Sequence, residues 1–194
     1  MNYYVLEYQY PRKGFISGGA TFTPAVEYYD PIQTDLPPYT TAEVILDSRL
    51  RKMDVDFFYT GTRATVVSDA FKQLLEQYPT PTQFVPAKVY YHNHALVSTT
   101  YWIAHRIQPL DCVDYEASQY AGKQLVLRSI QQPPRRIAKG FEHIVLDEQK
   151  IGTNEWFTLD YTYISNPIIS ETLAQEIKAR KLHVHTTPIG DFKP

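Results

Sequence analysis

The same local signal occurs twice in this sequence of 194 residues, as VVSD at residues 66–69 and as IISE at residues 168–171. In each stretch a β-branched pair favours a strand, a serine suits the N-cap of a helix, and an acid follows at the first helical position. Apolar residues then recur at helical spacing. The signal predicts two strand-to-helix junctions, with short helices at about 69–77 and 171–180.

The rest of the sequence favours strands and turns. It contains 16 Tyr, 9 Phe and 14 Pro, so many residues suit a pleated sheet and many turns have a fixed backbone. Strand candidates include residues 3–8, 84–91, 95–106 and 124–130, whereas residues 147–154 are predicted to form a polar turn. We therefore predict an α+β fold with a mixed, mostly antiparallel sheet on which the two helices pack.

The N-terminal third differs in composition from the remainder. Prolines and tyrosines are frequent between residues 23 and 39, which predicts a loop or covering arm rather than a helix. We expect residues 1–60, which hold the first strand and this arm, to be part of the same domain as residues 61–194.

Charge and cysteine content exclude several classes of protein. The formal charge is −2, from 19 basic and 21 acidic residues, so no basic field favours nucleic acid or an anionic membrane. The single cysteine, Cys112, excludes an internal disulfide, and the first residues lack the pattern of a secretory leader. We therefore expect a cytoplasmic protein that does not insert into a membrane.

A set of short motifs carries a family resemblance. Besides the two junctions, the chain contains QFVPAKV at residues 83–89, YW at 101–102, PLDCVDYEAS at 109–118 and IVLDE at 144–148. In this order and spacing, from about residue 60 onward, the sequence resembles bacterial polymorphic-toxin immunity proteins of the Imm11 (DUF1629) type, and it is similar to the related Imm43 family. The resemblance implies a protein that is not an enzyme, needs no cofactor, and neutralises a cognate toxin by binding it and occluding its active site or surface.

Three groups of side chains are candidates for contact with such a partner. An acidic loop could meet a basic toxin surface, although acids in turns commonly make only local hydrogen bonds. Two tyrosine pairs lie beside predicted turns, where an exposed ring offers large contact area, although most tyrosines of such a domain belong to its core. The candidate residues are Asp111, Asp114 and Glu116 in the loop, Tyr28 and Tyr29 in the arm, and Tyr90 and Tyr91 at a hairpin tip.

Two other functions remain open at this point. The pairs His92/His94 and His183/His185 would place imidazoles on one face of a strand, so a metal-dependent hydrolase is an alternative, although no Cys, Asp or Glu lies at a helpful spacing and exposed histidines at strand ends explain the pairs better. A structural domain that self-associates through a sheet edge is the other alternative. The sequence leaves the oligomeric state open.

Two further features are expected to have structural explanations. Cys112 lies among apolar residues and is predicted to be a small buried side chain rather than a nucleophile. The basic cluster at residues 133–136, followed by Lys139, contains too few charges for a nucleic-acid site and is predicted to be a solvated loop.

Overall fold

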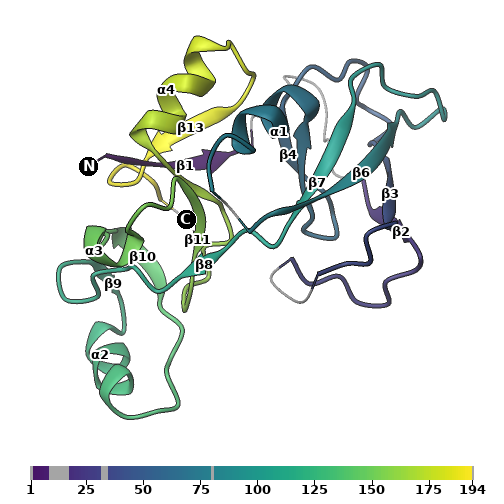
Figure 1. Ribbon diagram of the computed structural model, residues 1–194. Helices are drawn as coiled ribbons and strands as arrows, with labels where there is room; N and C mark the ends of the chain where they lie inside the picture. Colours follow the sequence, from purple (N-terminus) through teal and green to yellow (C-terminus); the bar gives the residue numbers. More distant parts are fainter. Residues whose placement is uncertain (1, 9–17, 32–34, 80, 194) are drawn as a thin grey trace. The chain divides into compact units, whose positions relative to one another are not determined.

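The computed structural model describes residues 2–8, 18–31, 35–79 and 81–193 (Figure 1). Its strands are β1 (Tyr3–Glu7), β2 (Ala20–Thr23), β3 (Thr41–Ile45), β4 (Phe57–Tyr59), β5 (Thr65–Ser68), β6 (Gln83–Tyr90), β7 (Tyr101–His105), β8 (Pro109–Leu110), β9 (Gln119–Ala121), β10 (Lys139–His143), β11 (Trp156–Leu159), β12 (Ile168–Ser170) and β13 (His185–Pro188). Its helices are α1 (Asp69–Leu75), α2 (Lys123–Gln131), α3 (Glu148–Ile151) and α4 (Glu171–Ala179). No helix among the described residues is long and apolar enough to cross a membrane.

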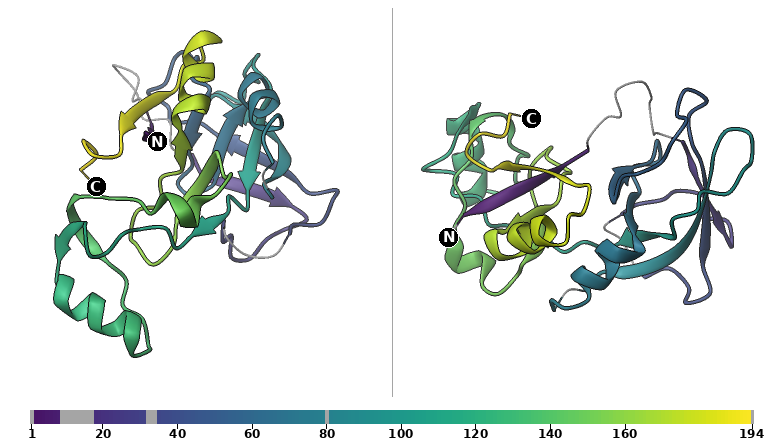
Figure 2. Two further views of the ribbon diagram at one scale, coloured as in Figure 1. Left: turned by 60° about the vertical axis from the view of Figure 1, so that its left-hand side comes forward. Right: turned by 90° about the horizontal axis from the view of Figure 1, so that it is seen from above.

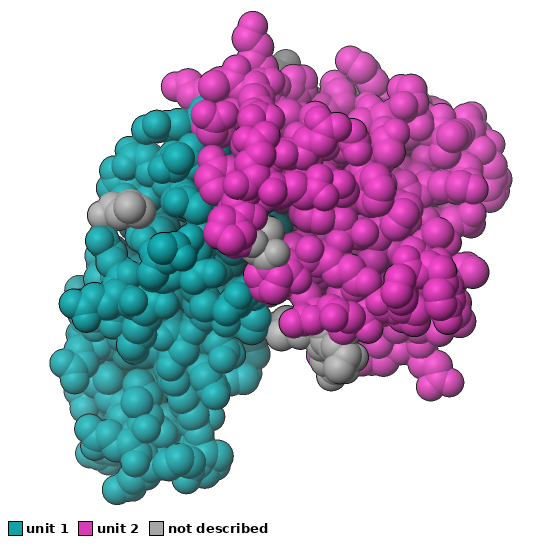
Figure 3. Space-filling model, in the orientation of Figure 1, with its two compact units in different colours: residues 1–6, 108–175, 186–194 teal, residues 7–107, 176–185 magenta. Residues whose placement is uncertain are grey.

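The chain divides into two compact units, coloured separately in Figure 3. Unit 1 comprises residues 1–6, 108–175 and 186–194, and unit 2 comprises residues 7–107 and 176–185. Each unit has its own sheet and its own cluster of buried apolar side chains. The expectation that residues 1–60 belong to the same domain as residues 61–194 stays a prediction.

Unit 2 is built on a six-stranded sheet in the order β2-β3-β6-β7-β5-β4. β3 and β6 run parallel, and the other neighbours are antiparallel. Helix α1 lies against β5 and β7 and buries three apolar side chains, those of Phe71, Leu74 and Leu75 (Figures 1 and 2). The predicted arm at residues 23–39 begins at the last residue of β2 and contains no helix among its described residues, while residues 32–34 lie outside them.

Unit 1 is built on a five-stranded sheet in the order β13-β1-β12-β11-β8. β12 pairs antiparallel with β1 and β11, and β8 runs parallel to β11. A separate two-stranded sheet joins β9 and β10, and helix α2 follows β9 (Figure 1). The first strand of the chain and strands near its end therefore share one sheet.

The predicted α+β class is confirmed, and so are the two predicted helices, which appear as α1 and α4. Two elements differ from the prediction. Residues 124–130, predicted as a strand, lie in helix α2, and the predicted turn at 147–154 begins with helix α3. Alternation of apolar residues over so short a run fits both periods, and α2 buries only Val126 and Ser129 while leaving Leu125 exposed.

The two predicted junctions share the same contacts. Ser68 caps α1, because its Oγ accepts a hydrogen bond from the backbone N–H of Phe71 at 3.2 Å and its hydroxyl donates to Asp56. Ser170 does the same for α4, accepting from Leu173 N–H at 3.1 Å and donating to Glu155. Each serine therefore satisfies a free N–H of the first helical turn and is itself held by a carboxylate.

The strands around each junction also correspond. Within unit 2, β5 lies between β4 and β7, with Phe57 opposite Val67 and Tyr101 opposite Ser68. Within unit 1, β12 lies between β11 and β1, with Trp156 opposite Ile169 and Tyr3 opposite Ser170. Each acid that holds a capping serine directly precedes the strand paired on one side. The repeated sequence signal thus marks a repeated three-strand and helix arrangement.

Replacing Ser68 or Ser170 by alanine should lower the free energy of unfolding by about 1 to 2 kcal/mol each, because each change leaves one helical N–H without its cap. Both serines are buried, so water cannot replace the lost oxygen fully. Urea denaturation followed by circular dichroism measures the change. Ser98→Ala, at an exposed position, is the control and should differ from wild type by less than about 0.5 kcal/mol. Equal stability of all three variants would contradict the capping role.

Candidate partner-binding site

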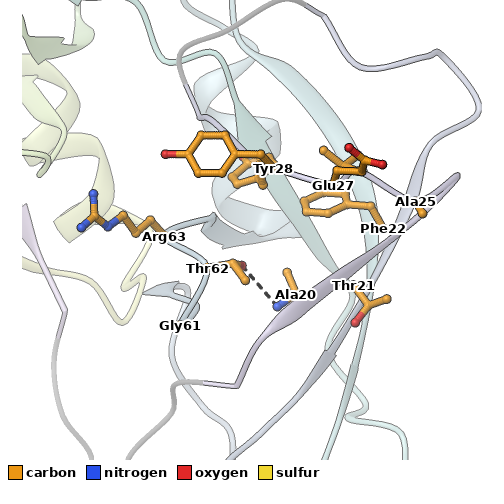
Figure 4. Close-up of a pocket in the computed structure, with 11 residues that line it drawn as sticks. Ala20, Thr21, Phe22, Ala25, Glu27, Tyr28, Gly61, Thr62 and Arg63 are labelled. Atoms are coloured by element: carbon orange, nitrogen blue, oxygen red, sulfur yellow. Dashed lines mark hydrogen bonds between the residues drawn. The ribbon is translucent and has the colours of Figure 1, made fainter.

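A cavity of about 540 Å³ opens on unit 2, between strand β2, the segment that follows it and the turn from β4 to β5 (Figure 4). Hydrogen bonds hold the two walls together at one end. Gly61 N–H donates to the carbonyl of Gly18 at 2.8 Å, and Ala20 N–H donates to Thr62 Oγ1 at 3.3 Å. The hydroxyls of Thr60 and Thr62 share a further hydrogen bond at 2.9 Å. The cavity is therefore part of the folded unit, and we call it the β2 groove.

Two adjacent tyrosines of the β2 groove have different environments. The ring of Tyr29 stacks on Phe22 with 4.7 Å between centroids, and its hydroxyl lies 3.3 Å from Nδ1 of His105. Burial raises the pKa of Tyr29, which therefore stays neutral. Tyr28 is 80% exposed, and Figure 4 shows its ring at the groove. Of the predicted pair, Tyr29 belongs to the packing and Tyr28 presents a free ring.

Arg63 is the cation among the described residues that line the β2 groove, and Glu27 is the carboxylate. Arg63 is exposed and has a φ of 63°, in the left-handed region that favours glycine or asparagine. Its guanidinium makes no hydrogen bond or ion pair with the part of the chain that the structure describes. In Figure 4 Arg63 and Glu27 lie on opposite sides of the groove.

The acidic loop lies in unit 1 and is tied to its own surroundings. Asp111 forms a two-pronged ion pair with Arg135, in which Nη2 donates to Oδ1 at 2.7 Å and Nη1 donates to Oδ2. The guanidinium of Arg135 lies 5.0 Å from the ring centre of Tyr115 and 4.0 Å from that of Tyr161. These contacts define what we call the Arg135 clamp. Arg135, predicted to lie in a solvated loop, is instead largely enclosed because an acid and two rings surround it.

The other two acids of the loop differ from each other. Asp114 Oδ1 accepts the backbone N–H groups of Glu116 at 3.0 Å and Ala117 at 2.9 Å, so this carboxylate stabilises the turn. The side chain of Glu116 is exposed. Of the three predicted acids, Glu116 is the one whose carboxylate makes no hydrogen bond or ion pair with the described residues.

Comparison with protein families matches residues 19–186 to the immunity protein family Imm11. The chain belongs to the Imm11 family. No curated protein matches the sequence. The match confirms the resemblance seen in the motifs and extends it toward the N-terminus, so that it includes the β2 groove as well as both junctions.

The two predicted tyrosines at the hairpin tip of this Imm11 protein are both half-buried, unlike the exposed Tyr28 of the arm. Tyr91 is held inside unit 2, because its hydroxyl accepts the backbone N–H of Met53 at 3.0 Å. Tyr90 ends β6 and is half-buried, and its carbonyl accepts Leu46 N–H at 2.8 Å. Contact of either ring with a partner stays a prediction, which binding measurements on alanine variants would test.

The histidines of the Imm11 chain do not gather with other ligands. All four residues of the two pairs are exposed, and His185 lies 3.7 Å from Glu7. Among the residues that the structure describes, no group of three or more His, Cys, Asp or Glu side chains lies close enough to hold a metal ion. The histidines thus give the hydrolase alternative no positive support.

Cys112 is fully buried, as its apolar neighbours predicted. Burial raises the pKa of its thiol to about 12, so it stays protonated at neutral pH and is a poor nucleophile. This confirms the interpretation of Cys112 as a small core residue.

Sequence reasoning missed the residues that close and charge the β2 groove. Gly18, Thr62 and Arg63 belong to no motif, and the turn TGTRA at residues 60–64 reads as an ordinary hairpin connection. The glycine within that sequence is a usable signal for a tight turn. It does not predict that the turn lies against β2.

Proposed function

We propose that this chain neutralises a cognate bacterial toxin by binding it in the cytoplasm and covering the toxin's active site or an adjacent surface. Membership of the Imm11 immunity protein family is the observation that carries the proposal. The proposed mechanism is steric and electrostatic occlusion, which requires a stable surface and no chemistry by the immunity protein itself.

Features of the surface support a binding role. The β2 groove offers an exposed ring and a cation that makes no hydrogen bond or ion pair with the described residues, and tyrosine and arginine are among the side chains enriched at the energetic centres of protein interfaces. Glu116 adds an exposed carboxylate on unit 1. Among the described residues, the surface offers only single charges of each sign at these places rather than a broad charged field. Such charges favour recognition of one partner over general attraction to polyanions or membranes.

The test uses a candidate toxin, chosen from the genes that flank the one encoding this chain. Expression of the toxin alone should stop growth of a bacterial host, and co-expression of the immunity protein should restore growth. The purified pair, prepared with a catalytically inactive toxin variant, should elute as one complex with a Kd of about nanomolar or below, as expected for a stable inhibitory complex.

Light scattering separates the other outcomes. A mass corresponding to two copies of this chain without toxin would favour a self-associating structural domain. Growth rescue without any complex would overturn the binding mechanism and favour an activity on the toxin or its target. A complex that forms without rescue would show that binding does not neutralise the toxin, which also overturns the proposal.

A further inference from the structure

Hydrogen bonds join the two walls of the β2 groove. One wall is strand β2 and the other is the turn from β4 to β5. The hydrogen bond from the backbone N–H of Gly61 to the carbonyl of Gly18 joins them. A Cβ atom on Gly18 would lie 1.5 Å from the carbonyl oxygen of Ile45, so no other residue fits this close approach. A preformed groove loses little entropy when a segment of a partner enters it.

Arg63 holds the left-handed position of the tight turn from β4 to β5, where its backbone N–H donates to the carbonyl of Thr60 at 2.9 Å, but the turn does not require its side chain. At a φ of 63° glycine or asparagine would be favoured, yet the position holds a long cationic side chain. That side chain is exposed and has no hydrogen bond or ion pair with any described residue. The turn accounts for the backbone conformation, whereas no contact with the described residues accounts for a long cation at this position, so the side chain is available to a ligand.

The charges of the groove select the kind of ligand. One guanidinium attracts a carboxylate, whereas Glu27 on the opposite side disfavours a chain of phosphates (Figure 4). Between these charges Tyr28 presents an exposed ring, and the half-buried Val26 adds apolar surface beside the buried ring of Phe22. This combination fits a polypeptide segment that carries an acid next to an apolar side chain.

We propose that the β2 groove binds a surface segment of the cognate toxin, in which an Asp or Glu side chain pairs with Arg63 and a neighbouring apolar side chain packs on Tyr28. The inference rests on the proposed function, because the toxin supplies the segment. Arg63 and Tyr28 then form the centre of the interface on unit 2.

Arg63→Gly separates binding from folding. The variant should melt at the wild-type temperature, because release of the left-handed conformation offsets the flexibility that glycine adds to the unfolded chain. It should bind the inactive toxin about tenfold or more weakly, mainly through faster dissociation. Tyr28→Ala, at an exposed position, should weaken binding by a similar factor without loss of stability.

Arg51→Ala is the matched control, since Arg51 is also an exposed arginine of unit 2 but does not line the groove. Its Kd should stay within about twofold of wild type, because isolated surface charges contribute little. Calorimetric titration gives the affinities, and surface plasmon resonance gives the dissociation rates.

The outcomes distinguish this inference from the proposed function. If wild type does not bind toxin, the proposed function fails and the groove assignment fails with it. If wild type binds and rescues growth while Arg63→Gly and Tyr28→Ala bind equally well, the groove assignment alone is overturned. If Arg63→Gly and Tyr28→Ala both bind the toxin more weakly while the Kd of Arg51→Ala is unchanged, the groove assignment is supported.

Discussion

Gly18→Ala should lower the free energy of unfolding by about 3 kcal/mol or more, because the added methyl group has no space. The new Cβ would meet the backbone of Ile45 at 1.5 Å from its oxygen and 2.5 Å from its carbon. Backbone atoms cannot rotate away as a side chain can, so the start of β2 must separate from β3. That movement also breaks the hydrogen bond from Gly61 to Gly18, which closes the β2 groove.

Gly19→Ala is the control for this prediction. An added Cβ at Gly19 meets no atom within 4 Å, so the same methyl group one residue away should change stability by less than about 0.5 kcal/mol. Guanidinium denaturation of both variants measures the difference. A Gly18→Ala protein as stable as the Gly19→Ala protein would contradict the close approach of β2 to Ile45.

Asp111→Ala is expected to destabilise the protein by about 2 kcal/mol. The change removes both hydrogen bonds to Arg135 and leaves its guanidinium between two rings without a counter-charge. The Nε atom of Arg135 is already buried without a hydrogen-bond partner among the described residues, so the cation gains no compensation there. The exposed part of Asp111 limits the loss to less than that of a fully buried pair.

A double-mutant cycle tests the origin of this loss. Arg135→Met keeps an unbranched apolar stem between Tyr115 and Tyr161, so Asp111→Ala combined with Arg135→Met should be more stable than Asp111→Ala alone. Glu116→Ala, in the same loop but exposed, should be neutral within about 0.5 kcal/mol. If the double variant is less stable than Asp111→Ala, the penalty does not come from the unpaired cation, and the clamp as described is wrong.

Short-range signals were sufficient for the two junctions. Each combines a strand-forming pair, a capping serine and helical spacing within about ten residues, and each helix ends within two residues of its predicted limit. The same approach failed for residues 124–130. Leu125, Val126 and Leu127 form a short apolar run that is compatible with either a strand or a helix. The decision for a helix depends on what Val126 and Ser129 pack against, which lies beyond the local sequence.

Long-range contacts decided the roles of the candidate site residues. Tyr28 and Tyr29 are neighbours of the same type, yet only the packing of Phe22 and His105 around Tyr29 separates a structural ring from a free one. The partner of Asp111 lies 24 residues away in a segment that looked solvated. The left-handed conformation of Arg63 has no sequence signal, since arginine is not a residue that predicts it.

The position of β1 has a consequence for the order in which the protein can form on the ribosome. Its Tyr3 pairs with Ser170, and the carbonyl of Tyr3 accepts the N–H of Ile189, so β1 cannot complete its pairing until both of these residues have been synthesised. Unit 1 therefore completes its sheet only after β12 and β13 have emerged. Most of unit 2, including the described residues that line the β2 groove, lies between residues 7 and 107 and emerges before them. Folding during synthesis thus favours unit 2 first. Strand β1 then pairs later, when unit 1 completes its sheet.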